Sequence, residues 1–379
     1  MKICHIGNIN TIHFQNIINT LQEQGHENYL LSLNTPVSKV REGTLYPGVR
    51  WYFVGPLTQG SLFSGSFWRS RYKSAQKVKN LIQQLKPDLV HAYYLTDAGL
   101  LSAFAKYHPY VVLAIGSDVL IDYQHNFLKK QAINFSLNNA DLILCYSRQI
   151  EQVLNHQPRL LSKVKYFPNG VNLARFKKAP PDETLLKKLN LEPQHKIVIS
   201  LRNFEPIYNI ECLIHAVPYV IEKIPTARFL LLGEGDSKES LISLAQSLNV
   251  ADYVHFLTPV PNSELPRYIN LASVYVSTAL SDGMSFALLE AMACEMPVVV
   301  TDIPANQVIV KHARNGFLFP KNDSNALVGY LIKLLSDQAL CATMGRYNQK
   351  IVADEYNFTD FMKQLSQAFQ QVCNGEFKC

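Results

Sequence analysis

Short apolar runs alternate with longer amphipathic segments along almost the whole chain. The runs at residues 1–7, 110–115, 196–202 and 274–276 are rich in β-branched residues and have the length of buried strands. The segments between them repeat their apolar residues at helical spacing, as residues 13–23 do. Regular alternation of strand and helix is typical of parallel sheets covered by helices. We therefore expect an α/β protein.

The length and composition narrow this picture. A chain of 379 residues predicts two domains, because single hydrophobic cores stop growing near roughly 250–300 residues. No run reaches the ~18 apolar residues that a membrane-spanning helix needs. The first strand begins at once, without a signal-peptide pattern, and the seven cysteines are scattered with no Cys-x-x-Cys pair. These features predict a cytoplasmic protein without a disulfide framework or a zinc site.

The charge is unevenly distributed. Residues 1–180 carry 20 Lys and Arg against 9 Asp and Glu (+11), whereas residues 181–379 carry 16 against 21 (−5), which together give the net +6. Within the basic half, residues 56–80 form the least regular part and combine Phe and Trp with several Lys and Arg. For the basic half, an anionic acceptor, an anionic membrane surface, nucleic acid or an ordinary solvated surface are open interpretations. For residues 56–80 the interpretations are a peripheral membrane contact or a loop whose aromatics pack inward.

The most informative stretch is residues 274–300, which read as strand, polar loop, helix and strand. Asp282 and Gly283 lie in the loop, and Glu290 lies inside the helix that begins near Phe286. A helix N-terminus attracts phosphate through its free N–H groups and its dipole, and Gly283 allows close approach of a ligand. A carboxylate one to two turns inside can accept hydrogen bonds from two neighbouring hydroxyls, as in a ribose. The alternative is a solvated loop Asp followed by a partly exposed helix Glu.

This stretch resembles the signature of retaining glycosyltransferases of the GT-B fold, of the group 1 or glycosyltransferase family 4 type. That signature has two acidic residues separated by seven positions, followed by Ala-Met-Ala and Pro-Val-Val, as residues 282–299 do. Two departures stand out: Asp282 replaces the usual Glu, and Glu295 replaces the Gly that usually ends the helix. Further matches occur in family order at residues 87–92, 140–147 and 166–176.

The resemblance implies a GT-B fold, with two Rossmann-like domains facing each other across a cleft. We expect an acceptor-side domain at residues 1–175, a linker at 176–195 and a donor domain at 196–356. The last helix, from about residue 360 to 372 within segment 357–379, is expected to cross back to the first domain.

The resemblance also implies a set of donor-side residues. Relatives grip the donor diphosphate with an Arg and a Lys; here the Arg is Arg202, but the Lys position holds Tyr208. Arg202 and Asp282 are expected to act in catalysis, with Asp282 near the hydroxyls of the transferred sugar. The remaining donor-binding candidates are Glu290, Gly283, Met284, Ser285, Phe286, Ala287, Tyr208 and Leu257.

The first domain contributes fewer candidates. Many relatives have a His before the Gly at position 116, but this chain has Ile115, so Asp118 and Ser117 become the polar groups expected at the sugar or acceptor. The alternative for Asp118 is a capping role in the following segment. Asn10 and His13 are expected to face the cleft, although a purely structural hydrogen bond would also explain His13.

The function implied by the resemblance is transfer of a sugar, with retention, from a nucleotide-sugar donor to a glycan or lipid-linked acceptor. A UDP-sugar is the expected donor and GDP-mannose the second choice. The chain has no Asp-x-Asp motif, so neither a divalent metal nor another cofactor is expected. Two alternatives are a catalytically degenerate GT-B protein that binds a partner, favoured by the missing Lys and His, and a GT-B enzyme of another class, such as a nucleotide-sugar epimerase or a DNA-modifying transferase. A nucleic-acid partner is not expected.

Overall fold

The computed structural model of the protein describes residues 1–33, 47–55, 57, 65–116, 118–123 and 127–376. The chain forms two compact units: unit 1 comprises Met1–Pro168 and Asp360–Cys379, and unit 2 comprises Asn169–Thr359. Each unit has its own parallel sheet and its own hydrophobic core. The predicted α/β class with two Rossmann-like domains is therefore confirmed.

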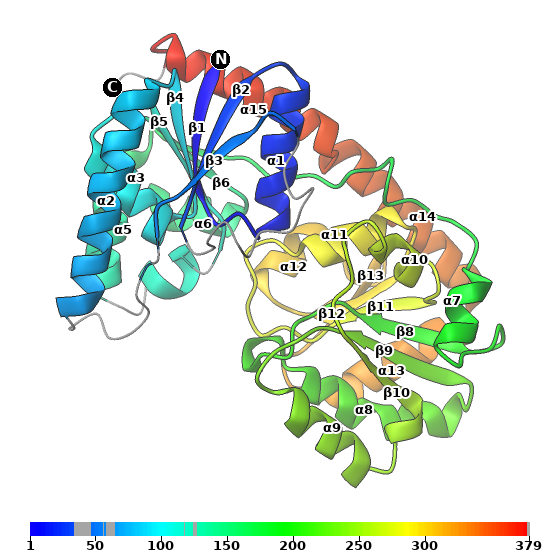
Figure 1. Ribbon diagram of the computed structural model, residues 1–379. Coiled ribbons are helices and arrows are strands. Elements are labelled where there is room, and N and C mark those ends of the chain that lie inside the picture. The colour runs from blue at the N-terminus through cyan, green and yellow to red at the C-terminus, as the bar shows by residue number, and fades with distance from the viewer. Residues whose placement is uncertain (34–46, 56, 58–64, 117, 124–126, 377–379) are drawn as a thin grey trace. The chain divides into compact units, whose positions relative to one another are not determined.

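Unit 1 is built on a seven-stranded sheet in the order β3-β2-β1-β4-β5-β6-β7, in which every pair is parallel. Its strands are β1 (Lys2–Gly7), β2 (Glu27–Ser32), β3 (Arg50–Phe53), β4 (Leu89–Tyr93), β5 (Tyr110–Ala114), β6 (Leu142–Cys145) and β7 (Val164–Tyr166). Its helices are α1 (Ile12–Glu23), α2 (Gly65–Leu85), α3 (Leu100–Ala105), α5 (Phe127–Asn139), α6 (Arg148–Asn155) and α15 (Phe358–Cys373). Figure 1 shows the strands fanning out between these helices.

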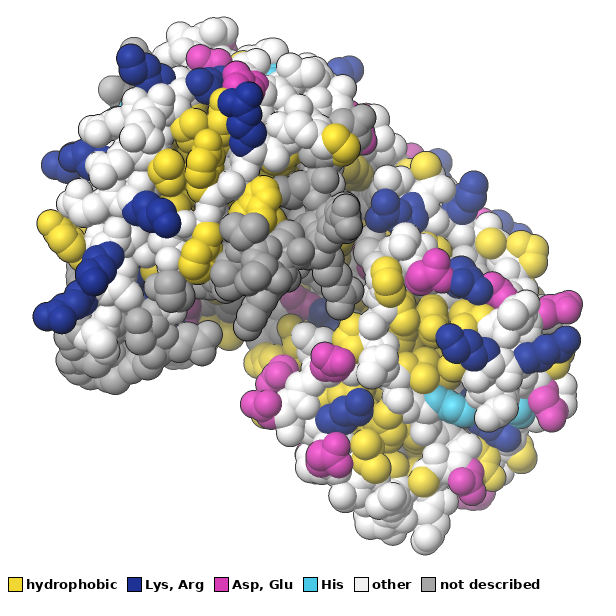
Figure 2. All heavy atoms as spheres, in the orientation of Figure 1, with side chains coloured by type: hydrophobic (Ala, Val, Ile, Leu, Met, Phe, Trp, Pro, Cys, Tyr) yellow, Lys and Arg dark blue, Asp and Glu magenta, His cyan; other side chains and the backbone are white. Residues whose placement is uncertain are grey.

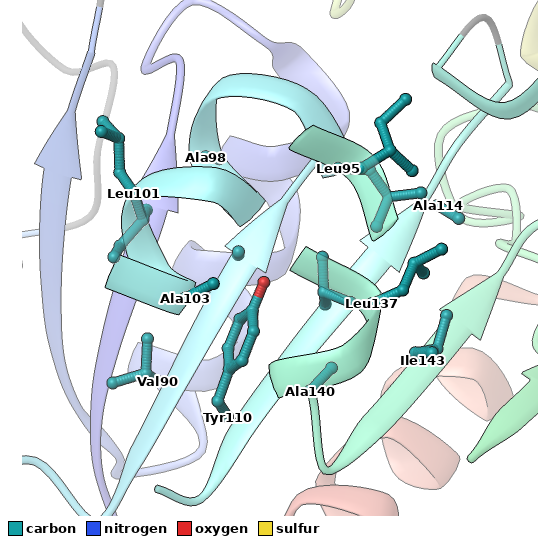
Figure 3. Packing of buried hydrophobic residues seen from close by; sticks show 14 of the residues in the cluster. Val90, Leu95, Ala98, Leu101, Ala103, Tyr110, Ala114, Leu137, Ala140 and Ile143 are labelled. Carbon is teal, nitrogen blue, oxygen red and sulfur yellow. The ribbon is translucent and has the colours of Figure 1, made fainter. Parts of the chain in front are cut away.

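The central strands of unit 1 do not alternate between polar and apolar residues, and the core shows the reason. β4 and β5 are buried along their whole length, because helices cover both faces of the sheet. Figure 3 shows the ring of Tyr110 rising from β5 among Ala103 of α3 and Leu137 of α5. The Tyr110 hydroxyl donates a hydrogen bond of 3.1 Å to the carbonyl of Gly99, so this buried polar group is satisfied.

The C-terminal helix α15 packs against the sheet of unit 1, as predicted. Phe361 of α15 packs against Phe167 and Tyr146, with ring centroids 5.2 Å and 6.3 Å apart. Further along the helix, Phe369 packs against His91 of β4 at 5.2 Å. Burial of this apolar face explains why residues distant in sequence share one core.

One expectation for unit 1 needs correction. The described part of the segment that we expected to be least regular forms a 21-residue helix, α2, which continues to Leu85. Val78 and Ile82 lie on the buried face of this helix, but the many basic residues between the apolar ones hid the helical spacing in the sequence. After β4 the chain forms a π-helical turn at Leu95–Gly99, and the short α3 follows it directly.

Unit 2 has a six-stranded parallel sheet in the order β10-β9-β8-β11-β12-β13. Its strands are β8 (Lys196–Ser200), β9 (Ala227–Leu232), β10 (Val254–Leu257), β11 (Val274–Ser277), β12 (Val298–Thr301) and β13 (Gly316–Phe319). Its helices are α7 (Glu183–Lys188), α8 (Ile210–Lys223), α9 (Lys238–Ser247), α10 (Leu265–Ile269), α11 (Phe286–Ala293), α12 (Pro304–Ile309), α13 (Ser324–Ser336) and α14 (Gln338–Glu355). In Figure 1, α8 and α13 cover one face of this sheet and α11 and α12 the other.

The segment after Pro168 packs with unit 2 rather than with the first sheet. Val171 forms a bridge with Asn357, and its amide donates 2.7 Å to the carbonyl of Tyr356. A side chain at Gly170 would meet the backbone of Asn357 at 2.4 Å, which explains the glycine at this point. Arg175, which we assigned to the end of the first domain, consequently lies in unit 2.

Candidate functional site

Two loops of unit 2 meet at one edge of its sheet. β8 and β11 are parallel neighbours, so the loops that follow them leave the sheet at the same side. The first loop carries Arg202 and the second carries Asp282. An Nη2–H of Arg202 donates to Oδ2 of Asp282, and this ion pair is largely buried. Both residues were predicted for the site, but their pairing was not.

Arg202 has two more contacts that hold its side chain. Its Nε–H donates 3.2 Å to the hydroxyl of Ser277, and its guanidinium carbon lies 4.9 Å from the ring centroid of Tyr208. Burial opposes the charge, but the nearby Asp282 and Tyr275 outweigh this effect and raise the pKa of Arg202 above its ordinary value. A permanent cation is thus held at the carboxyl edge of the sheet.

The backbones of the two loops are also joined. The hydroxyl of Thr278 donates 2.8 Å to the carbonyl of Tyr208, and the amide of Leu280 donates 2.9 Å to the carbonyl of Ile207. A third loop supports them, because a Cβ at Gly233 would lie 2.3 Å from the carbonyl oxygen of Arg202. The positions of Arg202 and Tyr208 are therefore set by the β9 and β11 loops together.

Helix α11 begins directly beside these loops. Ser285 caps it, since its hydroxyl accepts a hydrogen bond of 3.3 Å from the amide of Leu288. The amide of Gly283 donates 2.8 Å to Oδ1 of Asp282, which fixes the turn before the helix. Met284 and Ser285 are buried, and Phe286 and Ala287 are half-buried. The predicted donor-binding segment thus forms one continuous helix start.

Glu290 lies in the middle of α11 and is only 6% exposed. Its Oε1 accepts a hydrogen bond of 3.2 Å from the side-chain amide of Asn262. The oxygen of that amide in turn accepts a hydrogen bond of 2.7 Å from Arg175. Burial raises the pKa of Glu290 to about 7, while the Asn262 hydrogen bond and the Arg175 charge oppose this rise. Arg175 and Asn262 were not among the predicted site residues.

The end of α11 explains one departure from the family pattern. Glu295, at the position where the resembled signature has Gly, adopts the left-handed conformation with φ of 57°. Its backbone packs against α14, where a Cβ at Gly345 would lie 2.1 Å from the Glu295 carbonyl oxygen. The substitution therefore leaves the usual helix ending in place.

Leu257 is the last residue of β10 and is half-buried. Its carbonyl accepts a hydrogen bond of 3.1 Å from the amide of Gly233, which joins it to the β9 loop. Because β9 lies next to β8 in the sheet, this loop is adjacent to that of Arg202. Contact of Leu257 with a nucleotide base stays a prediction.

Asp118, in unit 1, is fully buried and accepts hydrogen bonds from backbone amides. Those of Gly116, Val119 and Leu95 lie 2.9, 3.1 and 3.2 Å from its carboxylate oxygens. Burial raises the pKa of Asp118 to about 6 against the opposing effect of these amides. These hydrogen bonds tie the Asp118 turn to the turn at Leu95, and among them only that from Val119 comes from the following segment. The capping and catalytic roles of Asp118 both stay predictions.

The other first-domain candidates lie around α1. Asn10 is exposed in the turn before the helix, where its amide donates 3.0 Å to the side chain of Asn8. His13 lies in the first turn of α1, and burial lowers its pKa to about 4, so it is neutral at physiological pH. Ser117 lies outside the described residues.

Within the described part of the chain, no group of three or more His, Cys, Asp or Glu side chains is arranged to hold a metal ion. No single described helix is long and apolar enough to cross a membrane. Helices α13 and α14 together have the length and apolar composition of a membrane-spanning segment, but the chain bends by 100° between them.

Comparison with known proteins gives matches over both halves of the chain. Residues 2–147 match the family described as glycosyl transferase 4-like, and residues 181–351 match the glycosyl transferases group 1. One curated relative is N-acetyl-alpha-D-glucosaminyl L-malate synthase of Bacillus anthracis, 22% identical over 94% of this chain and 92% of the relative. Another is the putative glycosyltransferase EpsD of Bacillus subtilis, 30% identical over 48% of each chain.

Solved structures agree on the fold. Sucrose-phosphate synthase of Thermosynechococcus elongatus has a TM-score of 0.82 at 21% identity, over 99% of this chain and 100% of that one. HepE of Anabaena, in complex with UDP and glucose, has a TM-score of 0.80 at 18% identity, over 98% and 99%. The two family regions and the two parallel sheets lead to one conclusion: the chain is a GT-B glycosyltransferase with a glycosyltransferase 4-like first half and a group 1 second half.

Proposed function

We propose that this glycosyltransferase binds a nucleotide-sugar through unit 2 and transfers the sugar, with retention, to a hydroxyl of a glycan or lipid-linked acceptor. A UDP-sugar is the proposed donor, with GDP-mannose second. One observation supports this proposal most directly. Arg202, the start of α11 and Glu290 lie on adjacent loops and one helix of unit 2. A cation and a helix N-terminus suit a diphosphate, and a carboxylate inside that helix suits the two ribose hydroxyls.

The names of several relatives favour the same chemistry. The HepE structures contain UDP, UDP with glucose, or UDP-glucose. Curated relatives include a UDP-Gal:alpha-D-GlcNAc-diphosphoundecaprenol alpha-1,3-galactosyltransferase and an alpha-monoglucosyldiacylglycerol synthase. A role in surface polysaccharide or glycolipid synthesis follows as part of the proposal.

In the proposed reaction the bond between the sugar carbon C1 and the departing diphosphate breaks, and a bond from C1 to the acceptor oxygen forms on the same face. The acceptor proton passes to an oxygen of the departing phosphate. Arg202 and the N–H groups at the start of α11 stabilise the negative charge that builds on that phosphate. Asp282 orients Arg202 through their ion pair.

A thermal-shift screen of nucleotides and nucleotide-sugars tests the donor assignment. A ligand that binds only the folded protein raises Tm by mass action, by the equivalent of ~2.7 kcal/mol at a hundredfold excess over Kd. We expect UDP and a UDP-sugar to raise Tm more than GDP, ADP or their sugars. Slow hydrolysis of the preferred UDP-sugar would eliminate the degenerate-protein alternative. No shift with any nucleotide would contradict the proposed function.

The proposed site works without a divalent metal, because Arg202 and the start of α11 supply the positive potential at the diphosphate. We expect the transfer rate to be unchanged in excess EDTA, and added Mg²⁺ or Mn²⁺ to change it little. A rate that falls to background with EDTA and returns with metal would contradict this site.

We further propose that α2 contributes a peripheral membrane contact. Trp68 and Tyr72 lie one turn apart and are 40% and 65% exposed, beside the exposed Arg69 and Lys73. In the view of Figure 2, Lys and Arg predominate over Asp and Glu on the described surface of unit 1.

Vesicle sedimentation tests this contact. Sedimentation with vesicles of equal parts phosphatidylcholine and phosphatidylglycerol should be reduced when Trp68→Ser and Tyr72→Ser are combined in one variant. The control is Tyr219→Ser, which removes an aromatic that is 56% exposed on α8. Equal sedimentation of all variants would contradict the contact.

A further inference from the structure

Tyr208 occupies the position where relatives have a diphosphate-binding Lys, and its ring lies against the guanidinium of Arg202. The Arg202 Cζ is 4.9 Å from the ring centroid, within the distance at which an aromatic face attracts a cation. We infer that Tyr208 is a positioning residue whose ring face holds Arg202 in the orientation needed for the donor diphosphate. This inference rests on the proposed function, because it assigns a means of orienting the same cation.

Arg202 is held by two hydrogen bonds, and the contact with the Tyr208 ring adds a third restraint on its guanidinium. Of its five N–H donors, Nε–H is used by Ser277 and one Nη2–H by Asp282. Among the described residues the structure shows no hydrogen-bond acceptor for the remaining three. These three can bind phosphate oxygens only while the guanidinium plane keeps its direction. The Tyr208 ring restricts rotation of that plane without occupying any of the donors.

The ring is itself held by the backbone of its turn. The carbonyl of Tyr208 accepts from Thr278 at 2.8 Å, and its amide donates 2.9 Å to the carbonyl of Glu205. The next residue, Asn209, has a positive φ of 49° and donates 3.0 Å from its side chain to Asn322. Within the described residues, no hydrogen bond of the Tyr208 hydroxyl is seen. The anchoring therefore depends on the backbone and the ring, and the hydroxyl is dispensable.

A lysine at this position would act differently from the ring. An ammonium near the Arg202 guanidinium would repel it, because the two charges have the same sign. The attractive ring face would also be lost. Tyr208 is accordingly not a weak replacement for the family Lys. This chain uses one oriented cation where its relatives use two.

Three variants separate the ring from the hydroxyl and from the missing charge. We expect Tyr208→Phe to lower kcat much less than Tyr208→Leu, because the ring face remains. Tyr208→Leu should lower kcat roughly tenfold, the size expected for a partly desolvated cation–π contact. Tyr208→Lys should not exceed wild type. The inference is overturned if Phe is as defective as Leu, or if Lys raises kcat above wild type.

A double-mutant cycle distinguishes positioning from general structural damage. In an Arg202→Gln background, Tyr208→Leu should lower kcat no further, because there is no guanidinium left to orient. A further tenfold loss in that background would overturn the inference. Tm of each variant shows whether the fold is kept.

An NMR measurement tests the inference without any donor. In ¹⁵N-arginine-labelled protein, the Arg202 Nε–H signal is identified by its loss in Arg202→Gln. Its exchange with water should be as slow in Tyr208→Phe as in wild type and markedly faster in Tyr208→Leu. Equal exchange in all three proteins would overturn the inference. If no nucleotide binds the wild type but the exchange pattern is as expected, the proposed function fails while the orientation of Arg202 by Tyr208 stands.

Discussion

Replacing Arg202 with alanine is expected to lower kcat by on the order of 10²-fold or more, with a smaller change in nucleotide affinity. The reason is that negative charge builds on the departing phosphate only as the sugar–phosphate bond breaks. The family Lys is absent here, so Arg202 is the cation placed by motif to meet that charge. Its fixed contacts with Ser277 and Asp282 make it preorganised. Steady-state kinetics with the donor identified by the thermal-shift screen provide the measurement.

The Arg202 experiment needs two comparisons. Arg202→Ala leaves the Asp282 carboxylate without its partner, which can destabilise the protein by itself. Arg202→Gln keeps a donor toward Asp282 but removes the charge, so a similar loss of kcat in Gln and Ala identifies the charge as the cause. Arg267→Ala is the matched control, because Arg267 pairs with Asp182 and Glu264 at an exposed site in the same unit. Wild-type kcat in both Arg202 variants would remove Arg202 from the catalytic assignment.

Replacing Glu290 with alanine is expected to weaken UDP binding by roughly 1.5–3 kcal/mol, or about ten- to 150-fold in Kd. The loss is that of a charged acceptor for the ribose hydroxyls. Asn262→Ala should weaken binding less, because it removes the hydrogen bond that orients the carboxylate and its link to Arg175. Isothermal titration with UDP measures both changes. Glu264→Gln, an exposed carboxylate on a neighbouring segment, is the control.

The raised pKa of Glu290 gives this binding a pH dependence. Above a pH of about 7 the carboxylate is ionised and accepts both hydrogen bonds; below it the group is protonated and one acceptor site is lost. UDP affinity should therefore fall as pH decreases through about 7, and Glu290→Gln should abolish that part of the dependence. If Glu290→Ala and Glu290→Gln both bind UDP as tightly as the wild type at every pH in this range, Glu290 is excluded from the nucleotide site.

The same pKa has the opposite consequence for stability. A carboxyl group whose pKa is higher in the folded state than its ordinary value of 4.5 binds its proton more tightly when folded. Its contribution to the free energy of unfolding is therefore fully present below about 4.5 and lost as pH rises through about 7. Weaker UDP binding at lower pH thus cannot be attributed to unfolding caused by this group.

The α/β class, most of the strands and the segments that carry the donor-side candidates could all be predicted from the sequence. Fully buried parallel strands read as continuous apolar runs, and in a parallel sheet the loops that follow neighbouring strands share an edge. The pattern failed at α2, whose basic residues lie on the exposed face of a regular helix. It also left open the role of Asp118, since a buried carboxylate bonded to backbone amides and a reactive one look alike in sequence.

Which side chains meet in the site could not be predicted from the sequence and is seen in the folded chain. Asp282 pairs with Arg202 across 80 positions, and Asn262 joins Glu290 to Arg175 across 28 and 87 positions. Such pairs depend on strand order and on the paths of loops, which local periodicity does not encode. In the sequence, Tyr208 at the position of the family Lys indicates only the loss of a positive charge. The ring contact with Arg202 turns it into a means of orienting the charge that remains, because an aromatic face attracts a cation only when the fold brings the two together.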